Sequence, residues 1–279
     1  MIVITSQFGQ LGNRLLIFAK FITLARHENL QLMNLGFSTY AEHFEVLQHD
    51  RLCRYPAGKR SGRVQARLAR LWYKRAAGTL PGTRVVHAGQ SKEFDLADPE
   101  FVEQARRGTV IFAGGWPRLD VDYKAEYADE VRAYFRPRVD IKARVADVMH
   151  RARQDCDVLV GLHVRQGDYR TWEAGRHYFS SAQYAALAPR LAALYPGQRV
   201  NFLVVSDERQ DPAAYAGLPV TFGTGNMMED LYSLAACDAI AGPTSTFAGW
   251  ASFYGRVPRW KIEDIEGPLT LANLKTVAA

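Results

Sequence analysis

The stretch DVLVGLHVRQGDY, residues 157–169, changes from a continuous apolar run to charged residues within a few positions. The apolar part is short and does not alternate, which is typical of a strand buried on both faces of a parallel sheet. His163, Arg165 and Asp168 follow at its end. Because the carboxyl ends of parallel strands border the ligand crevice in open α/β sheets, these side chains are candidates for contact with a bound molecule. A solvated strand end is the alternative explanation.

Strands and helices alternate along the rest of the chain. A strand at 2–5, a glycine turn at 7–12 and a helix at 13–26 form one unit near the start. Strands are also expected at 110–113, 200–205 and 220–222, with helices at 123–134, 138–153, 181–194 and 228–238. Alternation at this spacing predicts βα units and parallel sheets.

Length and composition are those of a folded globular chain with one large domain or two medium ones. The 279 residues are 48% hydrophobic and 23% charged. No apolar run is long enough to span a membrane and the N-terminus lacks signal-peptide features, so we expect a cytoplasmic protein. Cys53, Cys156 and Cys237 lie far apart with no Cys-x-x-Cys pair, which favours reduced thiols over a disulfide framework or a zinc site.

The positive charge is concentrated in one segment, 51–92. It holds eleven Lys or Arg and no Asp or Glu, whereas the rest of the chain has 24 basic and 29 acidic residues. Within it, helical spacing relates Val64, Leu68, Leu71 and Trp72, and Arg63, Arg67, Arg70, Lys74 and Arg75 supply a polar side. This pattern favours peripheral contact with an anionic membrane or a diphosphate-bearing acceptor. Binding of nucleic acid by charge alone and a merely solvated helix docked on the first domain are the alternatives.

Several common sites are absent from the sequence. There is no Gly-x-x-x-x-Gly-Lys-Ser/Thr phosphate loop, no complete dinucleotide-binding glycine motif and no Gly-x-Ser-x-Gly nucleophile turn. The pairs Asp120/Asp122 and Asp155/Asp157 could in principle hold a divalent ion. Three-residue patterns of this kind are common by chance, and we expect no metal site.

Three polar clusters remain, each after an apolar strand or at a helix start: 9–13, 163–168 and 242–250. The third brings hydroxyls at Thr244, Ser245 and Thr246 to the start of a helix, which is a natural place for an anion. With the planar guanidinium of Arg165 it describes a nucleotide-diphosphate pocket. A plain helix cap is the alternative for these hydroxyls. Asp207, at another strand end, could accept from the ring N–H and amino group of a guanine, or could cap a helix.

Four motifs occur in order: GQLGNR at 9–14, HVRQGDY at 163–169, VSDE at 205–208 and EDLYSLAACDAIAGPTSTFAGW at 229–250. Together they make the chain resemble the α-1,2-fucosyltransferases and, more distantly, the α-1,6- and protein O-fucosyltransferases. The resemblance covers residues 7–20 and 157–255. One position departs from it, because the family usually carries a second Arg where this chain has Gln166. That departure keeps open a related transferase that uses another nucleotide sugar.

The resemblance implies an α/β fold of the GT-B type, with two Rossmann-like domains whose parallel sheets face each other across a cleft. We accordingly expect an acceptor-side domain at 1–150, containing the basic segment 51–92. A nucleotide-sugar-binding domain is expected at 151–260, followed by a C-terminal tail at 261–279.

The resemblance also implies inverting transfer of fucose from GDP-fucose to a glycan hydroxyl, α-1,2-type, in surface polysaccharide or glycan synthesis on the inner face of a membrane. The acceptor would be a glycan, free or lipid-linked, and neither a cofactor nor a metal is required. The same resemblance implies donor contacts from His163 to the nucleoside, Arg165 to the β-phosphate, Asp207 to guanine, Thr244, Ser245 and Thr246 to the phosphates, and Gly12 and Asn13 to the sugar. Asp168 is the candidate base, or a brace for Arg165. A non-catalytic protein that binds a nucleotide or nucleic acid is the alternative of another class.

Overall fold

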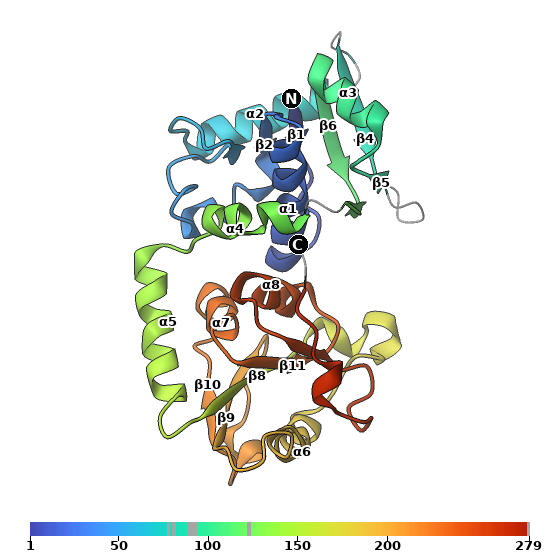
Figure 1. The fold of residues 1–279 in the computed structure, drawn as a ribbon. Coiled ribbons are helices and arrows are strands. Elements are labelled where there is room, and N and C mark those ends of the chain that lie inside the picture. Colours follow the sequence, from blue (N-terminus) through green and yellow to red (C-terminus); the bar gives the residue numbers. More distant parts are fainter. Residues whose placement is uncertain (77–78, 80–81, 89–93, 122–123, 278–279) are drawn as a thin grey trace. The chain divides into compact units, whose positions relative to one another are not determined.

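The computed structural model describes residues 1–76, 79, 82–88, 94–121 and 124–277, and the chain divides into two compact units, Met1–Arg138 and Val139–Val277 (Figure 1). The division lies earlier than the boundary expected at 150/151. The reason is helix α5 (Val139–Ala152), which packs against helix α7 (Met227–Leu234) and the neighbouring strands of the second unit.

The first unit is built on a five-stranded sheet with the order β3-β2-β1-β6-β4. Its strands are β1 (Ile2–Ile4), β2 (Leu32–Asn34), β3 (Arg54–Tyr55), β4 (Thr83–His87) and β6 (Thr109–Gly114). All neighbours pair in parallel except β3, which runs antiparallel to β2. Strands β5 (Phe94–Asp95) and β7 (Pro117–Arg118) form a separate small sheet.

Four helices accompany this sheet: α1 (Leu11–His27), α2 (Arg63–Ala76), α3 (Pro99–Arg107) and α4 (Lys124–Tyr134). Helix α1 packs against β2 and α4, and its buried Phe18 contacts the rings of Phe37, Tyr134 and Phe135. This aromatic cluster packs α1 against α4, although neither helix is strongly amphipathic. The predicted helices at 13–26 and 123–134 are confirmed, except that Tyr123 lies outside the described residues.

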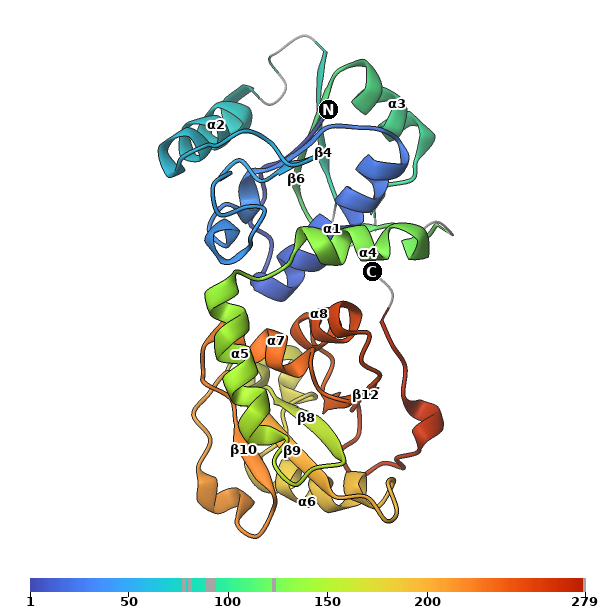
Figure 2. The same ribbon diagram turned by 60° about the vertical axis from the view of Figure 1, so that its left-hand side comes forward.

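The second unit has a fully parallel sheet with the order β10-β9-β8-β11-β12. Its strands are β8 (Val158–Val164), β9 (Val200–Ser206), β10 (Val220–Phe222), β11 (Ala239–Gly242) and β12 (Arg259–Lys261). Every residue of β8 is buried, as its continuous apolar run predicts. Helix α6 (Ser181–Ala192) lies on one face of the sheet, and α7 and α8 (Thr246–Gly255) lie on the other (Figures 1 and 2).

The order of these strands creates a switch point beside β8. Strands β9 and β10 extend the sheet on one side of β8, and β11 and β12 extend it on the other. The carboxyl ends of β8 and β11 therefore lie next to each other where the winding direction reverses. In open parallel sheets this is the place where ligands bind.

The segment expected as a tail after 260 is part of the second unit. The indole Nε1 of Trp260 donates to the carbonyl of Thr270 at 2.8 Å. Arg259 and Lys275 exchange backbone hydrogen bonds of 3.0 and 3.1 Å. These contacts fix the last described residues against β12.

Two other expectations concern the whole chain. Cys53, Cys156 and Cys237 are free cysteines, and Cys53 and Cys237 are buried, as predicted. Among the described residues, no helix combines the length and the apolar character needed to cross a bilayer.

Candidate functional site

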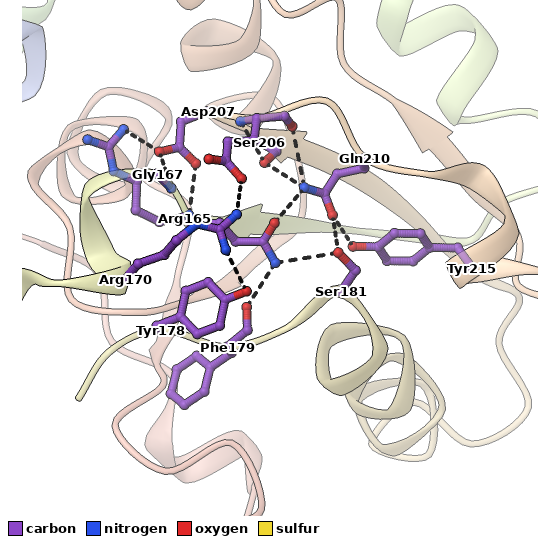
Figure 3. Close-up of polar contacts among 12 residues, drawn as sticks. Arg165, Gly167, Arg170, Tyr178, Phe179, Ser181, Ser206, Asp207, Gln210 and Tyr215 are labelled. Atoms are coloured by element: carbon purple, nitrogen blue, oxygen red, sulfur yellow. Dashed lines mark hydrogen bonds and ion pairs between the residues drawn. The ribbon is translucent and has the colours of Figure 1, made fainter. Parts of the chain in front are cut away.

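Arg165 leaves the carboxyl end of β8 and is held between two carboxylates. Its Nη2 lies 2.8 Å from Oδ1 of Asp168, and its Nη1 lies 3.3 Å from Oδ2 of Asp207, which follows β9. The guanidinium carbon stands 5.5 Å from the ring centre of Tyr169. Figure 3 shows Arg165 and Asp207 converging from their two strand ends. Asp168 is thus placed to brace Arg165, as one of its two expected roles requires, whereas the ion pair with Asp207 was not expected from the sequence.

Asp207 also shapes the loop that follows β8. Its Oδ1 accepts from the backbone N–H of Gln166 at 2.9 Å, and its Oδ2 accepts from the N–H of Gly167 at 3.1 Å (Figure 3). The carboxylate thus fixes both the backbone and the side chain of the Arg165 loop. Its predicted contact with a guanine stays a prediction.

Gln166, the position that departs from the family pattern, is buried and hydrogen-bonded inside the unit. Its Nε2 donates to the carbonyl of Phe179 at 3.0 Å, and its Oε1 accepts from Nε2 of Gln210 at 3.0 Å. Gln210 in turn accepts from Ser181 and Tyr215, at 2.8 and 3.0 Å (Figure 3). The amide of Gln166 therefore links β8, α6 and the segment after β9, and it adds no charge beside Arg165.

His163 lies at the end of β8 and is only 3% exposed. Its ring stacks on Phe247 with centroids 5.4 Å apart and planes 19° apart. Burial, and then the positive charges of Arg165 and Arg259, lower the pKa of His163 to about 3, so the ring is neutral. Its Nδ1 is buried without a hydrogen-bond partner in the described part of the chain. The predicted contact with a nucleoside stays a prediction, since the ring does not reach the surface here.

The start of α8 meets the Arg165 loop as the sequence predicts. Ser245 is the N-cap, and its Oγ accepts from the N–H of Phe247 at 3.1 Å. The hydroxyl of Tyr169 donates to the carbonyl of Thr244, which joins this helix start to the loop after β8. Thr244, Ser245 and Thr246 are half-buried at the switch point. The amino end of a helix carries partial positive charge, so this is a favourable place for an anion.

Arg259 is a second cation at this place that the sequence did not reveal. It begins β12, and its Nη1 donates to the carbonyl of Ser245 at 3.2 Å. Burial lowers the pKa of Arg259. The positive charge of Arg259 in turn contributes to lowering the pKa of His163. No motif surrounds this residue, and β12 was not expected. Only the pairing of β12 with β11 brings the guanidinium under the start of α8.

A cavity of 540 Å³ lies beyond the carboxyl ends of β9 and β10. Its lining includes Asp207, the turn Gly223–Gly225 and Asp230 from the first turn of α7. The carboxylate of Asp230 accepts from the N–H groups of Thr224 and Gly225, at 2.8 and 3.1 Å. Burial raises the pKa of Asp230 to about 6 despite these hydrogen bonds. Asp230 belongs to the motif at 229–250, but the sequence predicted no role for it.

Gly12 and Asn13 belong to the first unit, whereas the other candidate residues belong to the second. Gly12 is buried in the first turn of α1, and Asn13 is half-buried beneath the preceding turn. That turn contains Gly9 at φ 64°, and a β-carbon there would lie 1.9 Å from Nδ2 of Asn13. The turn is further held by Arg14, whose Nε donates to the carbonyl of Gly9 at 3.0 Å. The predicted role of Gly12 and Asn13 toward a donor sugar stays a prediction.

The expectation that neither Asp-x-Asp pair binds a metal stays a prediction, because the pair Asp120/Asp122 is only partly described. Asp157 pairs with Arg199 at 3.0 Å, which lowers its pKa to about 2, and Asp122 lies outside the described residues. Across residues 1–76, 79, 82–88, 94–121 and 124–277, no cluster of three or more His, Cys, Asp or Glu side chains could hold a metal ion.

Comparisons with known proteins give matches in structure only. No protein-family model matches the chain, and no curated protein matches its sequence. A mutant of Arabidopsis thaliana FUT1, solved in complex with GDP, superposes with a TM-score of 0.62 at 15% identity, over 96% of this chain and 72% of that one. The fucosyltransferase NodZ from Bradyrhizobium superposes with a TM-score of 0.58 at 15% identity, over 95% of this chain and 96% of that one.

Both superpositions extend over nearly the whole of this chain, whose two main sheets are parallel except at β3. The predicted α/β fold is confirmed. The chain has the GT-B-type fold of these solved fucosyltransferases.

Proposed function

We propose that this protein is an inverting glycosyltransferase that transfers fucose from GDP-fucose to a glycan hydroxyl. The observation that carries the proposal is the meeting of Arg165, braced by Asp168 and Asp207, with the start of α8 at the switch point of the second sheet. The fold shared with solved fucosyltransferases, one of them with GDP bound, supports it. The α-1,2 linkage and a role in surface polysaccharide synthesis rest on the sequence motifs alone.

In this proposal the diphosphate of the donor lies between Arg165 and the amino end of α8. A guanidinium presents two parallel N–H donors to a phosphate, and its orientation is already set here by ion pairs and by the ring of Tyr169. Arg259 adds a second positive charge beneath the same helix start. These groups face the charge that develops on the departing GDP, which is how prearranged dipoles and cations lower a barrier.

The nucleobase is proposed to enter the 540 Å³ cavity beside Asp207 and Asp230. A guanine offers a ring N–H and an amino group on one edge, and a carboxylate accepts both. Both carboxylates already accept backbone N–H groups, which fixes their positions before a ligand arrives. Each oxygen has more than one lone pair, so it can accept a further hydrogen bond.

The reaction would be a single displacement at the anomeric carbon. The acceptor oxygen forms a bond to that carbon, the bond to the β-phosphate oxygen breaks with its electron pair going to GDP, and the acceptor proton leaves late in the step. Asp168 is the proposed receiver of that proton, because its side chain is 58% exposed beside Arg165. Until the donor binds, this carboxylate braces Arg165 through their ion pair.

The first experiment is thermal unfolding of the purified protein with GDP, UDP, CDP or ADP, each with and without EDTA. A ligand at a hundredfold excess over its dissociation constant stabilises the folded state by about 2.7 kcal/mol, which is easily measured. We expect a shift with GDP that EDTA does not alter, followed by turnover of GDP-fucose with a glycan acceptor. A shift with UDP instead contradicts the donor assignment. Binding of GDP without any turnover of GDP-sugars points to a non-catalytic nucleotide-binding protein.

A further inference from the structure

Helix α2 presents a row of large apolar side chains to solvent. Val64 is 71% exposed, Leu68 61%, Leu71 47% and Trp72 51%. At roughly 100° per residue these four positions fall within an arc of about 100° on the helix surface. They account for four of the nine exposed large hydrophobic residues in the described part of the chain. We call this row the α2 apolar face.

The opposite side of α2 fixes its orientation. Ala66 is buried and Tyr73 is half-buried, and the helix packs against the 3-10 turn Leu35–Phe37. Nε of Arg70 donates to the carbonyl of Thr5 at 3.2 Å. The helix is therefore docked on the first unit, as the alternative of a solvated, docked helix also expects, but its four large apolar side chains take no part in the docking.

Cations accompany the α2 apolar face. On the helical projection Arg63, Arg67 and Lys74 follow one border of the face, and Arg75 lies at its C-terminal end. Their exposed side chains stand in a segment, 51–92, that contains no Asp or Glu. Arg63 also pairs with Glu42 of a neighbouring segment at 2.6 Å. An apolar arc bordered by cations is complementary to a surface that has negative charges in its outer layer and an apolar interior beneath them.

We propose that α2 binds the protein peripherally to an anionic lipid bilayer, with its axis parallel to the surface. Val64, Leu68, Leu71 and Trp72 would enter the boundary between headgroups and acyl chains, where a Trp ring is favoured. The border cations would meet lipid phosphates, with their long stems along the apolar layer. A nucleic acid offers the phosphates but no apolar layer, which is why the observations favour lipid. This inference does not depend on the proposed transferase activity.

The test is co-sedimentation of the full chain with phosphatidylcholine vesicles, with and without phosphatidylglycerol. We expect binding only to the anionic vesicles, and weaker binding at high salt because surface charge is screened. A triple variant Leu68→Ser, Leu71→Ser, Trp72→Ser should lose binding. Replacing Arg67, Lys74 and Arg75 with Gln should weaken it at least about tenfold, given the contribution of each cation near an anionic surface.

Matched controls lie in the second unit. Val139 and Leu271 are 73% and 51% exposed, so Val139→Ser with Leu271→Ser removes exposed apolar side chains elsewhere. Arg151 occupies the last turn of α5 as Arg75 occupies that of α2, which makes Arg151→Gln the charge control. Both controls should bind vesicles like the wild type. Every variant should keep its thermal shift with GDP, because α2 lies outside the proposed donor site.

Three results would overturn the inference. The first is equal sedimentation of the wild type and the apolar variant with anionic vesicles. The second is salt-sensitive binding to arbitrary DNA without vesicle binding, which would assign the cations to nucleic acid. The third is a concentration-dependent dimer that the apolar variant abolishes in the absence of vesicle binding, which would make a second copy of the chain the partner.

Discussion

Arg165 lies between Asp168 and Asp207, and the two carboxylates differ in how easily a ligand could replace them beside the guanidinium. Asp207 also accepts two backbone N–H groups, so its negative charge is shared with the loop and cancels less of the guanidinium charge. Asp168 is the more exposed partner and can be displaced more easily by a phosphate. The arrangement therefore holds the guanidinium in place while leaving it able to bind a dianion.

Replacing Arg165 tests this arrangement. Removing one partner from a desolvated charge pair costs about 2–5 kcal/mol, so Arg165→Ala should weaken GDP binding by at least about 30-fold in isothermal titration calorimetry. Arg165→Lys should also fail, because an ammonium cannot present two parallel donors. Arg170→Ala is the control, since Arg170 follows on the same loop but pairs with Glu208. Near-normal affinity in both Arg165 variants would remove this residue from the donor site.

Asp230 gives a prediction about pH. Burial raises its pKa from 3.8 to about 6, so between these values the folded protein keeps a proton that the unfolded chain has lost. The free energy of unfolding should therefore fall as pH rises through this range, by about 3 kcal/mol from this group. In urea titrations Asp230→Asn should show a flatter dependence on pH than the wild type. An identical dependence in the two proteins would mean that Asp230 titrates normally.

Two elements of the second sheet come unusually close at the site. A β-carbon on Gly242, at the end of β11, would lie 2.7 Å from the carbonyl oxygen of His163 in β8. The obstacle is backbone within a paired sheet, so it cannot move aside cheaply. Glycine at this position is what allows the start of α8 to follow directly beside the Arg165 loop.

Gly242→Ala should therefore separate β11 from β8 and destabilise the protein by about 1–3 kcal/mol, the usual range for overpacking. Chemical denaturation would measure it, and GDP affinity should fall as well because the two halves of the site move apart. Gly62→Ala is the matched control, because a β-carbon there has no heavy atom within 4 Å. A neutral Gly242→Ala variant would show that the sheet can relax at this point.

In the molecule as a whole, we expect GDP to affect the second unit and not the first. All proposed contacts to the diphosphate and the base lie in the second unit, which has its own hydrophobic core around β8 and β9. Hydrogen exchange with GDP should accordingly slow amides at 165–168, 223–225 and 244–248, and leave those of the glycine turn at 7–12 unchanged. Added protection at 7–12 with GDP-fucose but not with GDP would support the predicted role of Gly12 and Asn13. Protection confined to the first unit would contradict the donor site.

The sequence by itself determined the local elements and pointed to the strand ends at which the candidate site lies. A continuous apolar run predicted β8, and helical patterning predicted α1 and α5, each to within a few residues, because these patterns follow from which side chains face the core. The sequence also placed Arg165, Asp207 and Thr244 after strands of one parallel sheet, whose carboxyl ends share an edge.

Only the tertiary structure decided what depends on contacts between distant segments. Arg259 reaches Ser245 because β12 pairs with β11, and Asp230 lines a cavity because α7 packs beside β9. The division between the two units lies at 138/139 and not at the expected 150/151, because α5 packs on α7. Helical periodicity showed that α2 has an apolar face but not that this face points outward. Helical spacing indicates only which side chains lie on the same face of a helix. Whether another segment covers that face depends on packing across the whole chain.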